Sequence, residues 1–102
     1  MNGYVKVAKA ADIGAGTMKG YTINGVKVLI ANVGGKYYAL EDKCSHMGAK
    51  LSTGILTGNI VMCIAHSAQF DVTTGAPLNL LGKEPVKAYE LRVNSEDLEV
   101  KL

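Results

Sequence analysis

Apolar residues in this chain alternate with polar ones in short segments, and turn-forming residues separate the segments. The alternation is clearest near the C-terminus, where apolar positions recur at every second residue from Tyr89 to Val93 and from Leu98 to Leu102. The polar stretch Asn94-Ser95-Glu96 joins these two segments. A period of two is typical of β-strands that are buried on one face. The pattern therefore predicts an antiparallel hairpin with one buried face and one solvent-exposed face.

Further strand-sized segments fill most of the chain. Asn24-Gly25 is a strong hairpin signal, Gly34-Gly35 separates the next pair of segments, and only Ala10 to Ile13 resembles a helical turn. Short strands with frequent turns predict an all-β fold, a sandwich or small barrel, in a single domain spanning residues 1–102. The other expected strands are Tyr4 to Ala8, Thr17 to Ile23, Val26 to Val33, Lys36 to Asp42, Ile60 to Cys63 and Gln69 to Val72.

Composition narrows the classes of function. The chain has 102 residues, 48% of them apolar, which suffices for one modest core. Its formal net charge of +2 and the lack of a basic stripe argue against nucleic acid or a membrane surface as partner. No signal peptide or membrane-spanning stretch is expected. We therefore expect a cytoplasmic monomer whose cysteines are reduced or bound to metal.

All cysteines and histidines of the chain lie in two short motifs, Cys44-Ser45-His46 and Cys63-Ile64-Ala65-His66. Each motif opens a segment that interrupts the strand pattern, from Lys43 to about Asn59 and from His66 to Pro85. Long irregular segments in a compact domain are usually functional. Thiolate and imidazole are ligands that iron, copper and zinc prefer. The two motifs therefore predict a metal site, if the two segments meet.

Other interpretations fit the residues alone. Isolated cysteines are often small buried hydrophobes. A Cys44–Cys63 disulfide is geometrically possible, although it leaves both histidines unexplained. Two Cys and two His are also a standard zinc set, but zinc motifs usually group Cys with Cys and His with His. A catalytic Cys–His pair needs only one residue of each type.

The order and spacing of the motifs resemble those of the Rieske family. Cys-x-His is followed by sixteen residues and then by Cys-x-x-His. The flanking residues are similar too, with Gly48 after the first motif, Leu51-Ser52-x-Gly54 beyond it and Phe70-Asp71-x-x-Thr74-Gly75 after the second. Both motifs, their flanks and the strand pattern together cover essentially the whole chain.

This resemblance implies an antiparallel β-sandwich with a small cluster-binding subdomain at one tip, at about residues 43–75. It also implies one [2Fe–2S] cluster. The thiolates of Cys44 and Cys63 would bind one iron. The imidazoles of His46 and His66 would bind the other iron.

The resemblance further implies electron transfer without a catalytic site. We expect a ferredoxin that carries one electron from a flavin-dependent reductase to a terminal oxygenase or another acceptor. We expect neither an oxygenase catalytic domain nor a respiratory membrane anchor in these 102 residues. A fixed small Rieske subunit of a reductase complex, similar to those of nitrite reductases, is the alternative. A structural zinc module is the third hypothesis.

The flanking residues also indicate a subtype. High-potential Rieske proteins carry a second cysteine in each motif, and a Ser and a Tyr hydroxyl donate to the cluster sulfurs. The corresponding positions here are Ala49, Ala65, Ala68 and Phe70. None of them can form the disulfide or donate such a hydrogen bond.

We therefore predict a low reduction potential, because fewer donors stabilise the more negative reduced cluster. The midpoint should lie near the lower end of the range of Rieske centres, roughly −150 to +300 mV. Ile64 and Ser67 stand where Pro and Gly are common in the second motif, and they bear on the final value. Potentiometry measures the midpoint, and a value well above zero would contradict the prediction.

Overall fold

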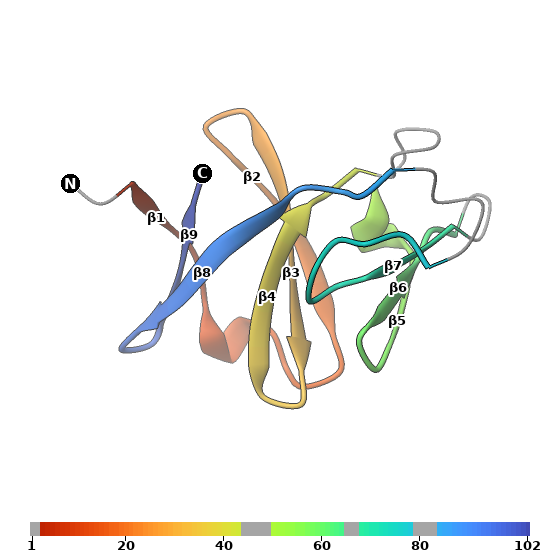
Figure 1. Cartoon of the computed structure of the whole chain (residues 1–102). Helices are drawn as coiled ribbons and strands as arrows, with labels where there is room; N and C mark the ends of the chain where they lie inside the picture. Colours follow the sequence, from red (N-terminus) through yellow and green to blue (C-terminus); the bar gives the residue numbers. More distant parts are fainter. Residues whose placement is uncertain (1–2, 44–49, 65–67, 79–83) are drawn as a thin grey trace.

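The chain forms two antiparallel sheets, and a computed structural model describes residues 3–43, 50–64, 68–78 and 84–102 of it (Figure 1). One sheet has the order β1-β9-β8-β4-β3-β2 and the other the order β5-β6-β7. The strands are β1 (Tyr4–Lys9), β2 (Met18–Ile23), β3 (Val26–Val33), β4 (Lys36–Glu41), β5 (Ile55–Thr57), β6 (Ile60–Met62), β7 (Gln69–Asp71), β8 (Ala88–Asn94) and β9 (Asp97–Lys101). Two 3-10 turns are η1 (Ala10–Asp12) and η2 (Leu51–Thr53). The prediction of an all-β, antiparallel fold is confirmed.

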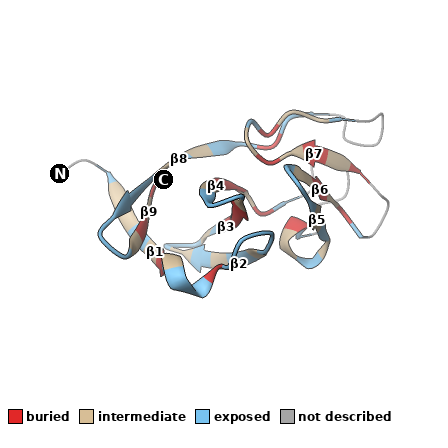
Figure 2. Ribbon diagram, turned by 90° about the horizontal axis from the view of Figure 1, so that it is seen from below, coloured by how far each residue is buried: buried red, intermediate tan, exposed pale blue. Residues whose placement is uncertain are grey.

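Two clusters of buried side chains lie on opposite faces of β3. Figure 2 shows this strand between the small sheet and the β1–β9 layer. The first core contains Leu29, Ala31, Leu40, Leu51, Val61, Cys63, Ala68, Phe70, Val72 and Val86. The second core contains Ala8, Ile13, Val28, Ile30, Ala39, Leu98 and Val100. Alternate residues of β3 enter different cores because successive side chains of a strand point to opposite faces. The small sheet therefore covers one face of β3, while β1 and β9 cover the other.

The two tyrosines of β4 follow the same alternation. Tyr37 packs against the second core, and its hydroxyl donates a hydrogen bond to the carbonyl oxygen of Ala10, 3.0 Å away. Tyr38 packs against the first core.

In the described part of the chain, no helix is long and apolar enough to cross a membrane.

The expectation of an irregular segment from Lys43 to about Asn59 is wrong for its second half. Residues 51–57 contain η2 and β5, and β5 pairs with β6 across the turn at Gly58 and Asn59. A strand of three residues is too short to give a measurable period. The Gly-Asn dipeptide, a known hairpin signal, was the available clue.

A tight turn follows β7 and joins it to the segment that leads into β8. Asp71 Oδ1 accepts hydrogen bonds from the backbone N–H of Thr73 at 2.9 Å and from its hydroxyl at 2.7 Å. The backbone N–H of Gly75 donates to the carbonyl of Asp71, and the carbonyl of Gly75 accepts from the N–H of Val86 at 2.9 Å. Asp71 thus stabilises a turn.

Gly75 is required where it stands, because its φ is +82° and a Cβ there would overlap the carbonyl oxygen of Val86. Gly34 also has a positive φ, +59°, but has no neighbour within 4 Å of such a Cβ. We expect Gly75→Ala to lower the free energy of unfolding by about 1–3 kcal/mol more than Gly34→Ala does. Urea unfolding followed by circular dichroism measures both, and equal losses would contradict the role of the close approach.

The pKa of Asp71 lies below its ordinary value of 3.8, mainly because the Thr73 hydroxyl donates to the ionised carboxylate. A carboxyl whose folded-state pKa is depressed stabilises the fold above the ordinary pKa, and this contribution is lost as the pH falls through the folded-state value. Asp71→Asn should therefore destabilise the protein at neutral pH and weaken its loss of stability toward about pH 3. Urea unfolding across this range tests it, with the exposed Glu96→Gln as the control. A parallel pH dependence in Asp71→Asn and wild type would exclude the contribution.

Candidate metal centre

Cys63 follows directly after β6 and is completely buried. Its backbone N–H donates to the carbonyl oxygen of Ala68, 2.8 Å away, and this bond closes the connection from β6 to β7. The second motif therefore begins on a sheet whose register is fixed by the pairs Val61–Phe70 and Met62–Gln69. The thiol of Cys63 is placed by strand pairing.

Three of the four predicted ligands, Cys44, His46 and His66, lie outside the described residues. The flanking positions Gly48, Ala49, Ala65 and Ser67 also lie outside them. The structure does describe Lys43 and Lys50, which stand on either side of residues 44–49 in the sequence. Both are exposed.

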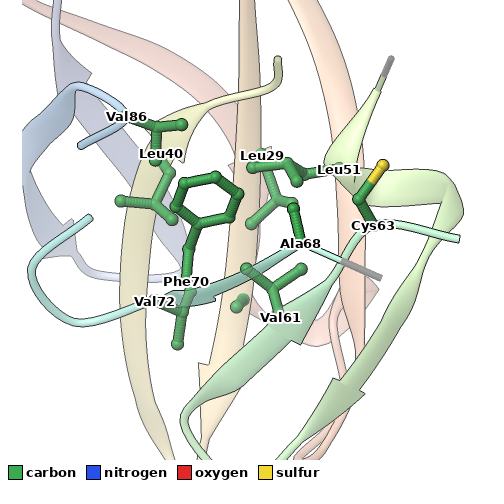
Figure 3. Close-up of a cluster of buried hydrophobic side chains, with 10 residues drawn as sticks. Leu29, Leu40, Leu51, Val61, Cys63, Ala68, Phe70, Val72 and Val86 are labelled. Carbon is green, nitrogen blue, oxygen red and sulfur yellow. The ribbon is translucent and has the colours of Figure 1, made fainter. Parts of the chain in front are cut away.

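The described residues that share the first core with Cys63 are apolar. Cys63 lies at one side of the first core, near Ala68 and Leu51, while Phe70 and Val86 lie toward the other side (Figure 3). Ala68 and Phe70 are fully buried, and neither carries a hydroxyl group. These are the two positions at which high-potential Rieske proteins carry a hydroxyl that donates to a cluster sulfur. Here both belong to the apolar wall formed by the residues of the first core beside Cys63.

These residues fit a Rieske cluster. Two ferric ions, two sulfides and two thiolates carry no net charge when both imidazole ligands are neutral. A neutral group loses little when it leaves water, whereas burying an unpaired charge is expensive. The buried thiol of Cys63 supplies a soft ligand, and the apolar wall suits an uncharged cluster.

Asp42 and Ser52 are functional candidates that the sequence analysis missed. Asp42 follows β4 and is 2% exposed, and its Oδ1 accepts from the backbone N–H of Ser52 at 2.8 Å. Its Oδ2 accepts from the Ser52 hydroxyl at 2.6 Å. We call these two bonds the Asp42–Ser52 clamp. It brings together the two ends of residues 43–51, and the only sequence signal for it was Ser52 within the flanking motif.

Comparison with known proteins identifies the family. The model of the Rieske [2Fe-2S] domain matches residues 3–90. The ferredoxin component of biphenyl 2,3-dioxygenase from Rhodococcus jostii (strain RHA1) is 32% identical over 97 residues, which cover 95% of this chain and 91% of that protein. The ferredoxin component of the naphthalene 1,2-dioxygenase/salicylate 5-hydroxylase systems from Ralstonia sp is 29% identical, covering 97% and 95%.

Solved structures agree with this relationship. The ferredoxin of carbazole 1,9a-dioxygenase from Nocardioides aromaticivorans IC177 superposes with a TM-score of 0.91 and 31% identity, covering 95% of both chains. A chain in a complex of reduced oxygenase and oxidised ferredoxin of carbazole 1,9a-dioxygenase gives a TM-score of 0.92 and 31% identity, covering 99% of this chain and 94% of that one. The predicted fold and the predicted [2Fe–2S] cofactor are confirmed, and the chain belongs to the Rieske [2Fe–2S] domain family.

Proposed function

We propose that this protein is a one-electron carrier that delivers electrons to an oxygenase. The relatives named above are ferredoxin components of dioxygenase systems, and one solved neighbour is a complex of a ferredoxin with its oxygenase. The family's cluster, when bound, takes up and releases one electron. An electron carrier needs a shielded cluster and a surface for its partners, and it needs no substrate pocket of its own.

The proposal of four ligands rests on the motifs, and one structural observation supports it. Leu51, at the end of the first motif's segment, is fully buried in the same core as Cys63. This shared core supports the proposal that the two motif segments meet, with Cys44 and Cys63 on one iron. His46 and His66 would bind the other iron. The cluster-binding subdomain would then comprise about residues 43–75, including the small sheet.

The described residues around the proposed site place the thiol of Cys63 and exclude water from the core beside it. Cys63 holds its sulfur on the buried face of the small sheet, and its backbone bond to Ala68 keeps that sulfur in place. Leu51 and Phe70 are fully buried and exclude water from the core beside it. A hydrophobic shell of this kind controls both solvent access and reduction potential.

The surface beside the first motif supports the choice of partners. Lys43 and Lys50 are exposed on either side of it in the sequence. Basic groups beside a redox centre attract acidic partner surfaces and orient the encounter. A flavin-dependent reductase is the proposed donor, and the carrier is proposed to act as a cytoplasmic monomer.

Optical and EPR spectra test the cluster and its ligands directly. The purified protein should show visible sulfide-to-iron bands that bleach with dithionite, and a paramagnetic signal should appear only on reduction. Pulsed EPR should detect nitrogen couplings from two bound imidazoles. Cys63→Ser should abolish or strongly alter the reduced signal, because a thiolate is replaced by a harder oxygen ligand.

Ile64→Ala is the matched control for this test. Ile64 lies between the proposed ligands Cys63 and His66 and is 66% exposed, so its removal leaves the donor set unchanged. This variant should keep the wild-type spectra. A colourless protein with stoichiometric zinc would refute the electron-transfer proposal.

A further inference from the structure

The Asp42–Ser52 clamp joins the two sheets of the protein. Asp42 is held at the end of β4, where its backbone N–H donates to the carbonyl oxygen of Lys27 at 3.0 Å. Ser52 belongs to η2, which leads into β5 of the small sheet. Both carboxylate oxygens of Asp42 accept a hydrogen bond from Ser52. Bonds to a carboxylate are among the stronger ones in proteins.

Gly20 closes the clamp from the side of β2. A Cβ at this position would overlap Asp42 Oδ2 and Ser52 Oγ, so β2 lies directly against the bonded pair. The φ of Gly20 lies outside the left-handed region, and the residue pairs regularly with Leu29 in the sheet. Its lack of a side chain therefore serves the close approach, since the backbone conformation does not require glycine.

The clamp also connects the two ligand motifs. Asp42 lies two residues before Cys44, and Ser52 follows Leu51 at the other end of the same segment. Leu51 is packed into the core that contains Cys63. A fixed Asp42–Ser52 pair thus sets both ends of the first ligand segment relative to the thiol of Cys63.

We infer that Asp42, Ser52 and Gly20 are positioning residues for the [2Fe–2S] cluster, with the clamp holding the first ligand segment against the second. The inference rests on the proposed ligand set. None of the three residues touches the cluster in this scheme. They would act through the chain between them, because Asp42 and Ser52 flank residues 43–51, which include two of the proposed ligands.

Loosening the clamp should have two consequences for the bound cluster. Asp42 and Ser52, at the two ends of residues 43–51, would separate more often, so a chelator would remove iron faster. Water would also approach the cluster more closely. Since the reduced cluster carries one more negative charge than the oxidised one, better solvation favours reduction and raises the midpoint potential.

Two variants open the clamp without changing the charge of the protein. Ser52→Ala removes the hydroxyl bond to Asp42 Oδ2 and keeps the backbone bond. Gly20→Ala removes no hydrogen-bonding group and introduces a methyl group at the position that the pair occupies. Because they act by different means, a shared effect identifies the clamp as its cause.

The chain offers a matched control for each variant. Thr53→Ala removes a hydroxyl from the same 3-10 turn, one that donates only to the nearby carbonyl of Lys50, at 2.7 Å. Gly14→Ala adds a methyl group to a glycine with nothing within 4 Å of the new Cβ. Neither control touches Asp42 or Ser52 in these contacts.

The experiment measures bleaching of the visible band in excess iron chelator, and the midpoint potential of the cluster that stays bound. We expect Ser52→Ala and Gly20→Ala to lose the cluster about tenfold faster than wild type, the effect of losing one bond to a charged group. Their midpoints should rise, and both controls should match wild type. Circular dichroism of the loaded proteins establishes that each variant is folded.

Each of three results would overturn the inference. If Ser52→Ala and Thr53→Ala lost iron at the same rate with unshifted midpoints, the clamp would contribute only to general stability. If Gly20→Ala behaved as Gly14→Ala does, the close approach of β2 would have no role in positioning. A wild-type protein without imidazole couplings in its reduced signal would instead refute the proposed ligand set, and the inference with it.

Discussion

Burial of β3 on both faces is the constraint on which the rest of the structure depends. Val28 and Ile30 enter one core while Leu29 and Ala31 enter the other, and all four are fully buried. Burying one large aliphatic side chain is worth about 1.5–3 kcal/mol. A single strand thus anchors both the β1–β9 layer and the small sheet, which carries Cys63 directly after β6.

The small sheet is attached to the large one mainly through the packing of its inner face. Strands of three residues have little stability of their own, because two- and three-residue ladders bury too little surface. Val61 and Phe70 in the small sheet pair with each other and contribute to the first core with Leu29 and Leu40. The small sheet is therefore held by the packing of its inner face, and the clamp adds a polar tie at its edge.

The long strands and the residue types of the proposed ligands were predictable from the amino-acid sequence, for a definite physical reason. The long strands alternate because each has a face in a core, and the ligand types were evident because thiol and imidazole groups occur nowhere else in the chain. The clamp was not predictable, since Asp42 and Ser52 are ten positions apart and meet only when β4 and η2 are packed. The strand β5 was not predicted for a different reason, because three residues are too few to show an alternation of apolar and polar residues. The glycine at position 20 looked like an ordinary strand residue until the tertiary contact gave it a role.

Strand parity has a consequence for how this domain can change. Val61 and Cys63 are both fully buried, whereas Met62 between them is only half-buried. Because Cys63 lies two residues after Val61, its thiol points to the same inner face of the small sheet. A one-residue slip between β6 and β7 would turn that face over and direct the sulfur outward. A change of one residue in the chain between Val61 and Cys63 would do the same, so the alternation of this short strand determines the face on which the proposed metal ligand lies.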